Sequence, residues 1–144
     1  MEQMPSDCIF CKIARGDIPC TKIFENEQVL AFLDINPWAE GHSLIIPKEH
    51  FARLEECSPA ALAALAAPLP ALSRAIMQVV GAEACNVLMN NGRSAGQLVD
   101  HVHLHLIPRR PDDRIIRHAP QGQYPEGQME QIASQIRSRL CDQS

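Results

Sequence analysis

Three histidines, His101, His103 and His105, alternate with apolar residues in the segment D-H-V-H-L-H-L-I-P. This period-two pattern is typical of a β-strand, and it predicts that the three imidazoles point to one face. Neighbouring imidazoles would lie ~6.7 Å apart and the outer two ~13 Å apart, so all three cannot easily share one ion. Imidazole serves as a metal ligand, a general acid or base, or a nucleophile. The alternative, an exposed polar strand face, is unfavourable because charged imidazoles repel one another.

The loop before this strand carries hydrogen-bond donors that suit a phosphate group. Asn90, Asn91 and Gln97 offer side-chain amides. Gly92 and Gly96 let backbone N–H groups approach a ligand closely. The loop and the histidines together indicate a site for a phosphorylated ligand.

Two cysteines near the N-terminus, Cys8 and Cys11, are separated by two residues in C-I-F-C. Two thiolates at this spacing can hold one tetrahedral ion. The other interpretations are two cysteines buried on a short helix and a redox pair, and the redox pair is disfavoured because no strand precedes the motif. The six cysteines of the chain are too few for a disulfide-built scaffold.

The length and composition predict one globular domain, residues 1–144. The chain is 46% hydrophobic and 21% charged, and its net charge of -4 disfavours nucleic-acid partners. Its longest apolar run, 60–72, is shorter than the ~20 residues of a membrane span and contains two prolines, so we expect no membrane span. The first residues carry two acids and do not resemble a signal peptide, which favours a cytoplasmic location.

The elements that position these residues follow from turn residues and periodicity. A short helix over 8–14 should end at Gly16, and a longer helix should run from Ser58 towards Val80 with kinks at two prolines. An apolar stripe near the C-terminus predicts an amphipathic helix that packs on the same subunit or on a dimer mate. The stripe contains Met129, Ile132, Ala133, Ile136 and Leu140. Strands are predicted over 22–25, 29–33, 43–47, 86–89 and the histidine segment.

The segment H-V-H-L-H-L-I resembles the signature of the histidine triad (HIT) family. Two upstream stretches, C-I-F-C-K-I-A-R-G-D-I-P and V-L-A-F-L-D-I-N-P-W-A-E-G-H-S-L-I-I-P-K-E-H, resemble the N-terminal half of histidine triad nucleotide hydrolases and transferases. The match is nearly continuous from Cys8 to Arg109. The resemblance implies an α+β, HIT-like fold: an antiparallel sheet with a long helix and a C-terminal helix, and a sheet that continues across a homodimer. The core motif region would span 8–110, followed by an extension over 111–144.

The resemblance also implies an activity, which is cleavage of a purine nucleotide conjugate, such as a conjugate of AMP, at its α-phosphorus. His103 would attack the phosphorus, and water would release the nucleoside monophosphate from a nucleotidyl-histidine intermediate. His105 would stabilise phosphate oxygens. The substrate would be a phosphoramidate, an adenylate or a dinucleoside polyphosphate.

Further roles are implied for residues that bind the nucleotide. Asn90 and Gln97 match positions whose amides bind phosphate, and Asp34 matches a carboxylate that accepts hydrogen bonds from the ribose. Asp34 could instead cap a turn. An apolar slot for the base matches four residues that would otherwise be ordinary core residues. These are Phe10, Ile13, Phe32 and Ile35.

Some family members carry a structural zinc ion on two cysteines and two histidines. This chain supplies the matching set, Cys8, Cys11, His50 and His101. A closed site with four protein ligands has no open position for substrate, so the zinc would brace the fold. A different hypothesis is a hydrolase in which His101 and His103 hold a catalytic ion.

The chain departs from some relatives at Leu98, where they carry a hydroxyl residue. Leucine cannot donate a hydrogen bond, so His105 or water would assist the leaving group. The sequence does not identify the physiological leaving group. It also allows an alternative function, a nucleotide-binding regulatory module with incidental turnover.

Overall fold

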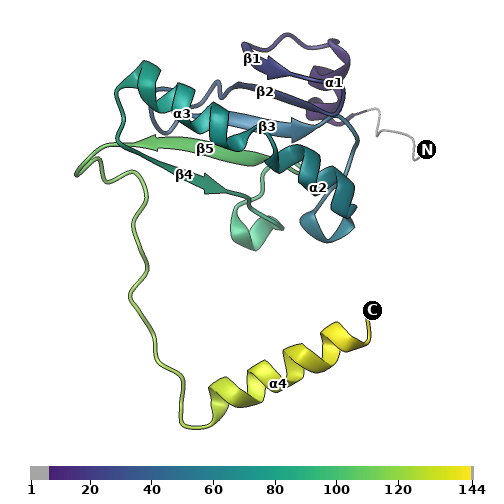
Figure 1. The fold of residues 1–144 in the computed structure, drawn as a ribbon, viewed down its shortest axis with the longest axis vertical. Coiled ribbons are helices and arrows are strands. Elements are labelled where there is room, and N and C mark those ends of the chain that lie inside the picture. The colour runs from purple at the N-terminus through teal and green to yellow at the C-terminus, as the bar shows by residue number, and fades with distance from the viewer. Residues whose placement is uncertain (1–6, 144) are drawn as a thin grey trace.

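The computed structural model describes residues 7–143 and shows one antiparallel sheet with helices on both faces (Figure 1). The strand order is β1-β2-β3-β5-β4, and every neighbouring pair is antiparallel. This arrangement confirms the predicted α+β class. The strands are β1 (Lys22–Glu25), β2 (Val29–Leu33), β3 (Ser43–Pro47), β4 (Ala84–Leu88) and β5 (Leu104–Arg109).

The central strands are buried on both faces because each face is covered by helices. Along β2, Val29 and Ala31 point into one core cluster, whereas Leu30 and Phe32 point into another. The first cluster includes residues of α2 (Pro59–Ala66) and α3 (Leu69–Val80), and the second includes Phe10 of α1 (Ile9–Arg15). The sheet therefore holds α1 on the face opposite α2 and α3.

Helix α1 begins and ends as the sequence predicts. The Sγ atom of Cys8 accepts a hydrogen bond from the backbone N–H of Cys11 at the first turn. Gly16 ends the helix with a φ of 85°, in the left-handed region that glycine adopts easily. This helix positions both cysteines of the C-I-F-C motif.

The predicted long helix is two helices in the structure. Ser58 caps α2 through its side-chain oxygen, as expected, and α2 ends at Ala66. Pro68 and Pro70 lack a backbone N–H, so the helical hydrogen bonding is interrupted and α3 begins at Leu69. By length and composition alone, the segment Pro59–Val80 is long and apolar enough to cross a membrane, with 22 residues and a mean hydropathy of 1.5. Here both helices pack on the sheet through Leu65, Leu72 and Ile76.

Strand β5 begins later than the histidine pattern predicts. Only His105 lies in the strand, because His101 and Val102 make loop hydrogen bonds to Val99 and Phe51. The predicted polar face is also buried, with exposed fractions of 0% for His101, 6% for His103 and 9% for His105. The three histidines therefore lie inside the molecule.

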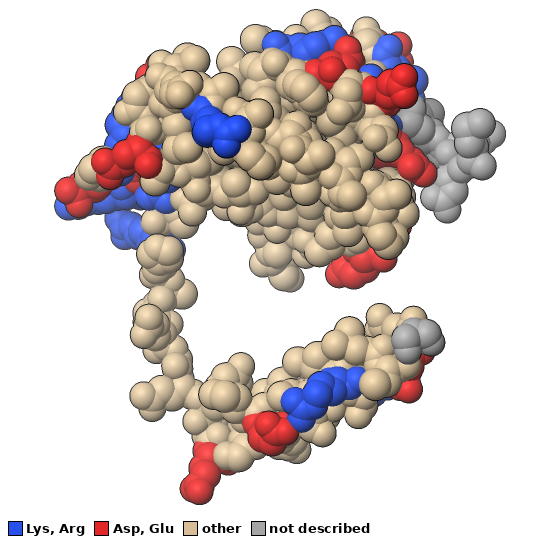
Figure 2. All heavy atoms as spheres, in the orientation of Figure 1, with Lys and Arg blue, Asp and Glu red and all other residues tan. Residues whose placement is uncertain are grey.

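A C-terminal arm follows β5. Residues 110–127 lead away from the sheet to α4 (Gln128–Cys141), which covers the predicted amphipathic stripe (Figure 1). No residue of α4 is buried. Figure 2 shows an open space between α4 and the rest of the protein.

Candidate functional site

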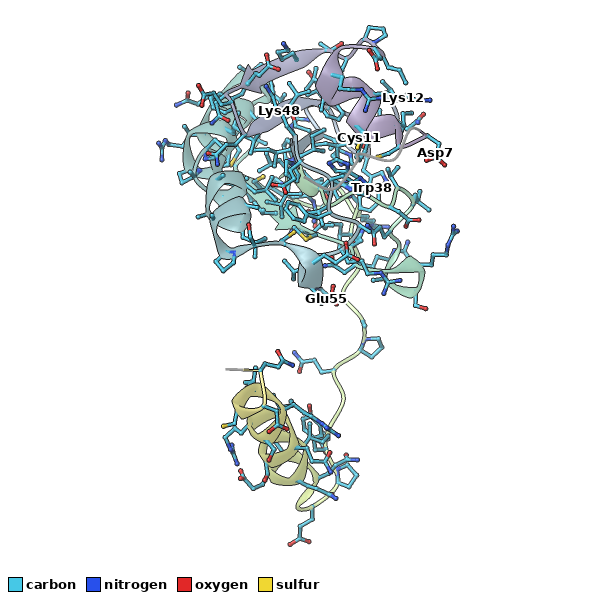
Figure 3. The ribbon with its side chains drawn as sticks, turned by 90° about the vertical axis from the view of Figure 1, so that its right-hand side faces the viewer. Asp7, Cys11, Lys12, Trp38, Lys48 and Glu55 are labelled. Atoms are coloured by element: carbon cyan, nitrogen blue, oxygen red, sulfur yellow. The ribbon has the colours of Figure 1, made fainter. Side chains whose placement is uncertain are left out.

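A cavity of about 400 Å³ lies between α1, β2, the loop before β5, and β5 itself. This volume is within the usual range of small-ligand sites. Figure 3 shows this side of the molecule, with Cys11 of α1 and Trp38 of the β2–β3 loop labelled. Most of the residues expected to bind a nucleotide line the cavity. They are Phe10, Ile13, Phe32, Asp34, Ile35, Asn90, His103 and His105.

His103 has one ring nitrogen fixed and the other free for chemistry. Its Nδ1–H donates to the carbonyl oxygen of His101 at 2.7 Å. The neutral ring then has an unprotonated Nε2, which carries the lone pair that a nucleophile needs. Burial lowers the pKa of His103, which favours this neutral form. Its ring packs edge to face with Phe10, with ring centroids 5.1 Å apart.

His105 has the opposite tautomer because a chain of hydrogen bonds starts at the backbone of Trp38. The N–H of Trp38 donates to Nδ1 of His42 at 3.0 Å, so the proton of His42 is on Nε2. That Nε2–H donates to Nδ1 of His105 at 2.9 Å. The proton of His105 is therefore on Nε2, where it can be donated to a phosphate oxygen. The Trp38 ring also stacks on His105, with an interplanar angle of 13°.

Asp34 caps a turn, as one of the two interpretations expects, and it also lines the cavity where the ribose is expected. Its Oδ1 accepts a hydrogen bond from the N–H of Asn36 at 2.8 Å, which is a turn cap. Its Oδ2 lies 3.7 Å from Nε2 of His42 and belongs to a carboxylate that lines the cavity. Although Asp34, His42 and His105 are close enough to surround an ion, Nε2 of His42 is protonated and cannot be a ligand.

The apolar slot is built from two layers. Phe10 and Phe32 are buried and meet edge to face, with ring centroids 5.9 Å apart. Ile35 lies at the rim, where 90% of it is exposed. An aromatic base could therefore enter between the buried phenylalanine rings and the exposed Ile35 side chain.

Gln97 differs from the expectation that its amide faces a phosphate. Its Oε1 accepts from the N–H of Gly92 at 2.7 Å, and its Nε2 donates to the carbonyl oxygens of Ala52 and Val99. The side chain is buried and lies outside the cavity lining. Gln97 thus positions the loop, while Asn90 in that loop lines the cavity.

The four predicted zinc ligands converge on one point, with their donor atoms all within 4.8 Å of one another. Nδ1 of His101 lies 3.4 Å from Sγ of Cys8 and 3.5 Å from Sγ of Cys11. Nδ1 of His50 lies 3.4 Å from Sγ of Cys11 and 3.2 Å from Nδ1 of His101. Tetrahedral zinc with ordinary bond lengths separates such donors by about 3.3–3.8 Å. The donor set therefore fits a closed zinc site.

The surroundings of this cluster also suit a metal ion. His101 donates its Nε2–H to the carbonyl oxygen of Pro47 at 2.8 Å, which leaves Nδ1 as the ligand atom. Burial lowers the pKa of His101 to about 4, so the ring is neutral. Burial raises the pKa of the Cys11 thiol to about 12, a cost to the thiolate that a bound cation would offset.

His101 links the metal cluster to the nucleophile through its backbone. Its ring faces the two cysteines, and its carbonyl oxygen holds Nδ1 of His103. Both ring nitrogens of His101 are thus engaged away from Nε2 of His103. This geometry disfavours the hypothesis that His101 and His103 hold a catalytic ion together.

Trp38 was not among the predicted site residues, although it is the only tryptophan in the sequence and lies in the motif N-P-W-A-E-G-H. Leu98, which the sequence marks as a departure, lines the cavity and is 91% exposed. No lysine or arginine is among the lining residues found within 7–143. The site therefore offers apolar surface and hydrogen-bond donors rather than cationic side chains.

The fold and the site define an α+β domain of the histidine triad class. The chain belongs to this family: a family profile described as HIT domain matches residues 15–112. The adenosine 5'-monophosphoramidase hnt1 of Schizosaccharomyces pombe is 53% identical over 102 residues, which are 71% of this chain and 74% of that protein. The adenylylsulfatase HINT3 of Arabidopsis thaliana is 41% identical over 96% of this chain and 72% of its own length.

Solved structures of the family have the same fold. The protein SMU.412c from Streptococcus mutans superposes with a TM-score of 0.92 at 39% identity, over 97% of this chain and 89% of that chain. A zinc-bound histidine triad family protein from Mycobacterium smegmatis superposes with a TM-score of 0.73 at 36% identity, over 92% of this chain and 97% of its own.

Proposed function

We propose that this chain is a nucleotide-binding hydrolase or transferase that cleaves purine nucleotide conjugates at the α-phosphorus and releases a nucleoside monophosphate such as AMP. The relatives named adenosine 5'-monophosphoramidase and adenylylsulfatase support an adenosine monophosphate conjugate as the substrate. The observation that carries the proposal is the pair of opposite tautomers, with a free Nε2 on His103 beside an Nε2–H on His105.

The proposed reaction has two steps at phosphorus. Nε2 of His103 attacks the α-phosphorus, and the bond from phosphorus to the leaving group breaks as a nucleotidyl-histidine forms. The leaving group departs with a proton, which His105 or water supplies because Leu98 has no proton to donate. Water then attacks the same phosphorus and the phosphorus–nitrogen bond breaks, which releases the monophosphate and regenerates neutral His103. Nε2–H of His105 stabilises the negative phosphate oxygens. Where His105 has protonated the leaving group, the proton that the attacking water loses restores its Nε2–H.

The charge of the site favours some leaving groups over others. The cavity lining within 7–143 contains the Asp34 carboxylate and no lysine or arginine. A polyphosphate leaving group would gain no cationic partner there, so phosphoramidates and acyl adenylates should be the better substrates.

Zinc is the proposed metal of the Cys8, Cys11, His50 and His101 cluster. The donor types, their separations and the zinc-bound family structure support this assignment. When bound, zinc would supply charge compensation for the thiolates and a cross-link between α1 and the histidine segment. It would leave the nucleophilic step to His103.

A homodimer is the proposed assembly, with the sheet continued through β4. Strand β4 is the last strand of the sheet and pairs only with β5 within residues 7–143. Val87 on β4 is 47% exposed. A second copy could pair with this free edge by the same backbone hydrogen bonds, and it would bury a strand edge that is otherwise prone to aggregation.

The first experiment compares the wild-type protein with His103→Ala, on a panel of adenosine phosphoramidates, acyl adenylates and dinucleoside polyphosphates. AMP release should fall by about a thousandfold or more in His103→Ala, while AMP affinity measured by calorimetry changes only a few fold. Mass spectrometry of quenched wild-type reactions should detect a nucleotidyl adduct on His103.

The competing function, a nucleotide-binding regulatory module, makes a different prediction for the same samples. It requires AMP binding in both proteins with equal and negligible turnover. Equal turnover in wild type and variant would instead contradict the covalent role of His103.

A further inference from the structure

The C-terminal helix has an apolar stripe with nothing buried against it. Met129 is 62% exposed, Ile136 is 54% exposed and Leu140 is 61% exposed. The helix has only 14 residues, and its N-cap Gly127 provides no side-chain hydrogen bond. An isolated helix of this length is marginal in water, so α4 needs a surface to pack on.

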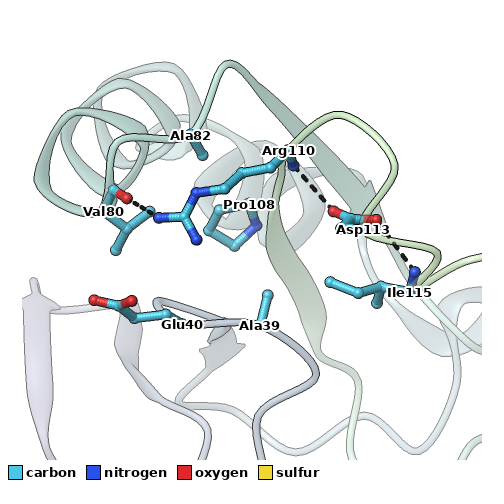
Figure 4. Close-up of a pocket in the computed structure, with 8 residues that line it drawn as sticks. All are labelled: Ala39, Glu40, Val80, Ala82, Pro108, Arg110, Asp113 and Ile115. Atoms are coloured by element: carbon cyan, nitrogen blue, oxygen red, sulfur yellow. Dashed lines mark hydrogen bonds between the residues drawn. The ribbon is translucent and has the colours of Figure 1, made fainter.

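The first residues of the arm are fixed on the body of the protein, which is the sheet with α1, α2 and α3. This attachment determines the direction in which the arm leaves. Figure 4 shows Asp113 accepting hydrogen bonds from the backbone N–H groups of Arg110 and Ile115. Asp113 also accepts a charged hydrogen bond from Arg109, at 2.6 Å. The guanidinium of Arg110 donates to the carbonyl oxygen of Val80 at the end of α3. These contacts hold residues 109–115 against the body.

The position of the arm is shared with a crystal structure of a relative. The superposition on the Streptococcus mutans protein covers 97% of this chain with a TM-score of 0.92. The uncovered remainder is smaller than α4, so the superposition must include most of that helix. The arm therefore has a similar position in that relative.

The body carries an apolar surface of matching character on α2 and α3. The sequence of α2, P-A-A-L-A-A-L-A, is apolar on every side, but Leu65 is its only buried residue. Only 17% of the most apolar 18-residue stretch of Pro59–Val80 is buried. Arg74 is the one charged residue between Pro59 and Val80. The exposed residues include Ala60, Ala63, Ala66, Ala67 and Ala71.

The arm lies beyond the edge of the sheet where a second copy is proposed to pair. In Figure 1, β4 is the lower edge of the sheet, and the arm with α4 lies below it. Figure 3, turned by 90°, also shows α4 (yellow) below the rest of the protein. A second copy paired through β4 would place its own helices on that side, within reach of α4.

We propose that the arm is exchanged between two copies of this chain, so that α4 of each copy docks on the exposed apolar surface of α2 and α3 of the other. Met129, Ile132, Ile136 and Leu140 supply the contacting stripe. This inference rests on the proposed homodimer. A twofold-symmetric dimer would bury the stripe of α4 and the apolar surface of α2 and α3 in both copies, because each copy gives one helix and receives another.

The first test substitutes one stripe residue and one residue on the opposite face of α4 with the same charged side chain. Ile136→Asp should raise the dimer dissociation constant by about a hundredfold or more, because two apolar contacts are lost in each dimer. Ser134→Asp adds the same charge outside the stripe and should leave that constant within about threefold. Sedimentation equilibrium of the full-length chains measures both, and Trp38 fluorescence reports whether the body is folded.

The second test detects the exchange directly. Dimers are mixed from one copy with labelled isoleucine methyl groups and another with labelled alanine methyl groups. Nuclear Overhauser effects from Ile132 and Ile136 to alanines of α2 or α3 in the other copy are expected. The exchange would be refuted if the dimer lacked these effects, or if Ile136→Asp and wild type had equal dissociation constants. Neither result would argue against the dimer itself. A wild-type chain that sediments as a monomer would overturn both, whereas the AMP-release assay of His103→Ala tests the activity independently.

Discussion

His103 and His105 have different chemical capacities because their Nδ1 atoms have different partners. Nδ1 of His103 faces a carbonyl oxygen, whereas Nδ1 of His105 faces the N–H of His42. One ring therefore presents a lone pair and the other a proton. Two residues of the same type, two positions apart, thus suit the attack on phosphorus and the stabilisation of phosphate oxygens.

His105 should make the stability of the protein depend on pH. Burial, and then the nearby His103 and His42, lower the pKa of His105 from 6.5 to about 4. Because the folded state binds a proton less readily than the unfolded chain, this contribution is complete above pH 6.5 and is lost as the pH falls towards 4. Relative to His105→Gln, the wild-type protein should lose about 2 kcal/mol of unfolding free energy between pH 7 and pH 4.5.

Urea unfolding of both proteins across this pH range measures the difference. Other groups that titrate on unfolding, including the metal ligands, contribute to both proteins and cancel in the subtraction. Parallel curves for wild type and His105→Gln would contradict the depressed pKa.

Gly41 lies at a close approach that tolerates no side chain. Its φ is 87°, and a Cβ atom would lie 2.8 Å from Cγ1 of Val80. Gly41→Ala should lower the unfolding free energy by about 2–4 kcal/mol, from backbone strain and overpacking together. Gly122→Ala is the matched control, because its Cβ would meet no atom within 4 Å and its φ is not positive. Thermal unfolding of the two variants distinguishes them, and equal melting temperatures would refute the argument.

At the scale of elements, α1 contributes to two sites at once. Its N-cap Cys8 and its residue Cys11 belong to the metal cluster, while Phe10 and Ile13 line the cavity. A seven-residue helix has little stability of its own. We therefore expect the metal to hold α1 in the position that shapes the nucleotide slot.

Cys11→Ser should abolish stoichiometric zinc and weaken AMP binding by about tenfold or more, because an unanchored α1 no longer fixes the slot. Zinc content by mass spectrometry and AMP affinity by calorimetry measure the two effects. Cys141→Ser, in the C-terminal helix, is the control and should retain both properties. If chelated wild-type protein bound AMP with unchanged affinity, the metal would not support the slot.

At the scale of the whole molecule, the proposed dimer makes thermal stability depend on protein concentration. Unfolding of a dimer releases two chains, so dilution favours the unfolded state. The melting temperature should rise by about 2 °C for each tenfold increase in concentration. Calorimetric scans over a hundredfold range test this, and a constant melting temperature would indicate that the folded unit is a single chain.

Much of the fold could be predicted from local patterns. Strands β1, β2 and β3 have the predicted bounds because turn residues punctuate short apolar runs, and α1 ends at Gly16 because glycine adopts its left-handed conformation readily. The division of the long helix at Pro68 was predicted only as a kink. Nothing local distinguishes a kink from a break, because that depends on how the two halves pack on the sheet.

The sequence by itself determined which chemical groups are present and their order: the alternating histidines, the cysteine pair and the glycine-rich loop. The tertiary structure decided which of them meet. It turned His101 towards cysteines some 90 residues away in the chain, committed Gln97 to the loop instead of the cavity, and brought Nε2 of His42 to Nδ1 of His105. These outcomes depend on long-range hydrogen bonds and burial, which set the tautomer of each imidazole and which local spacing does not encode.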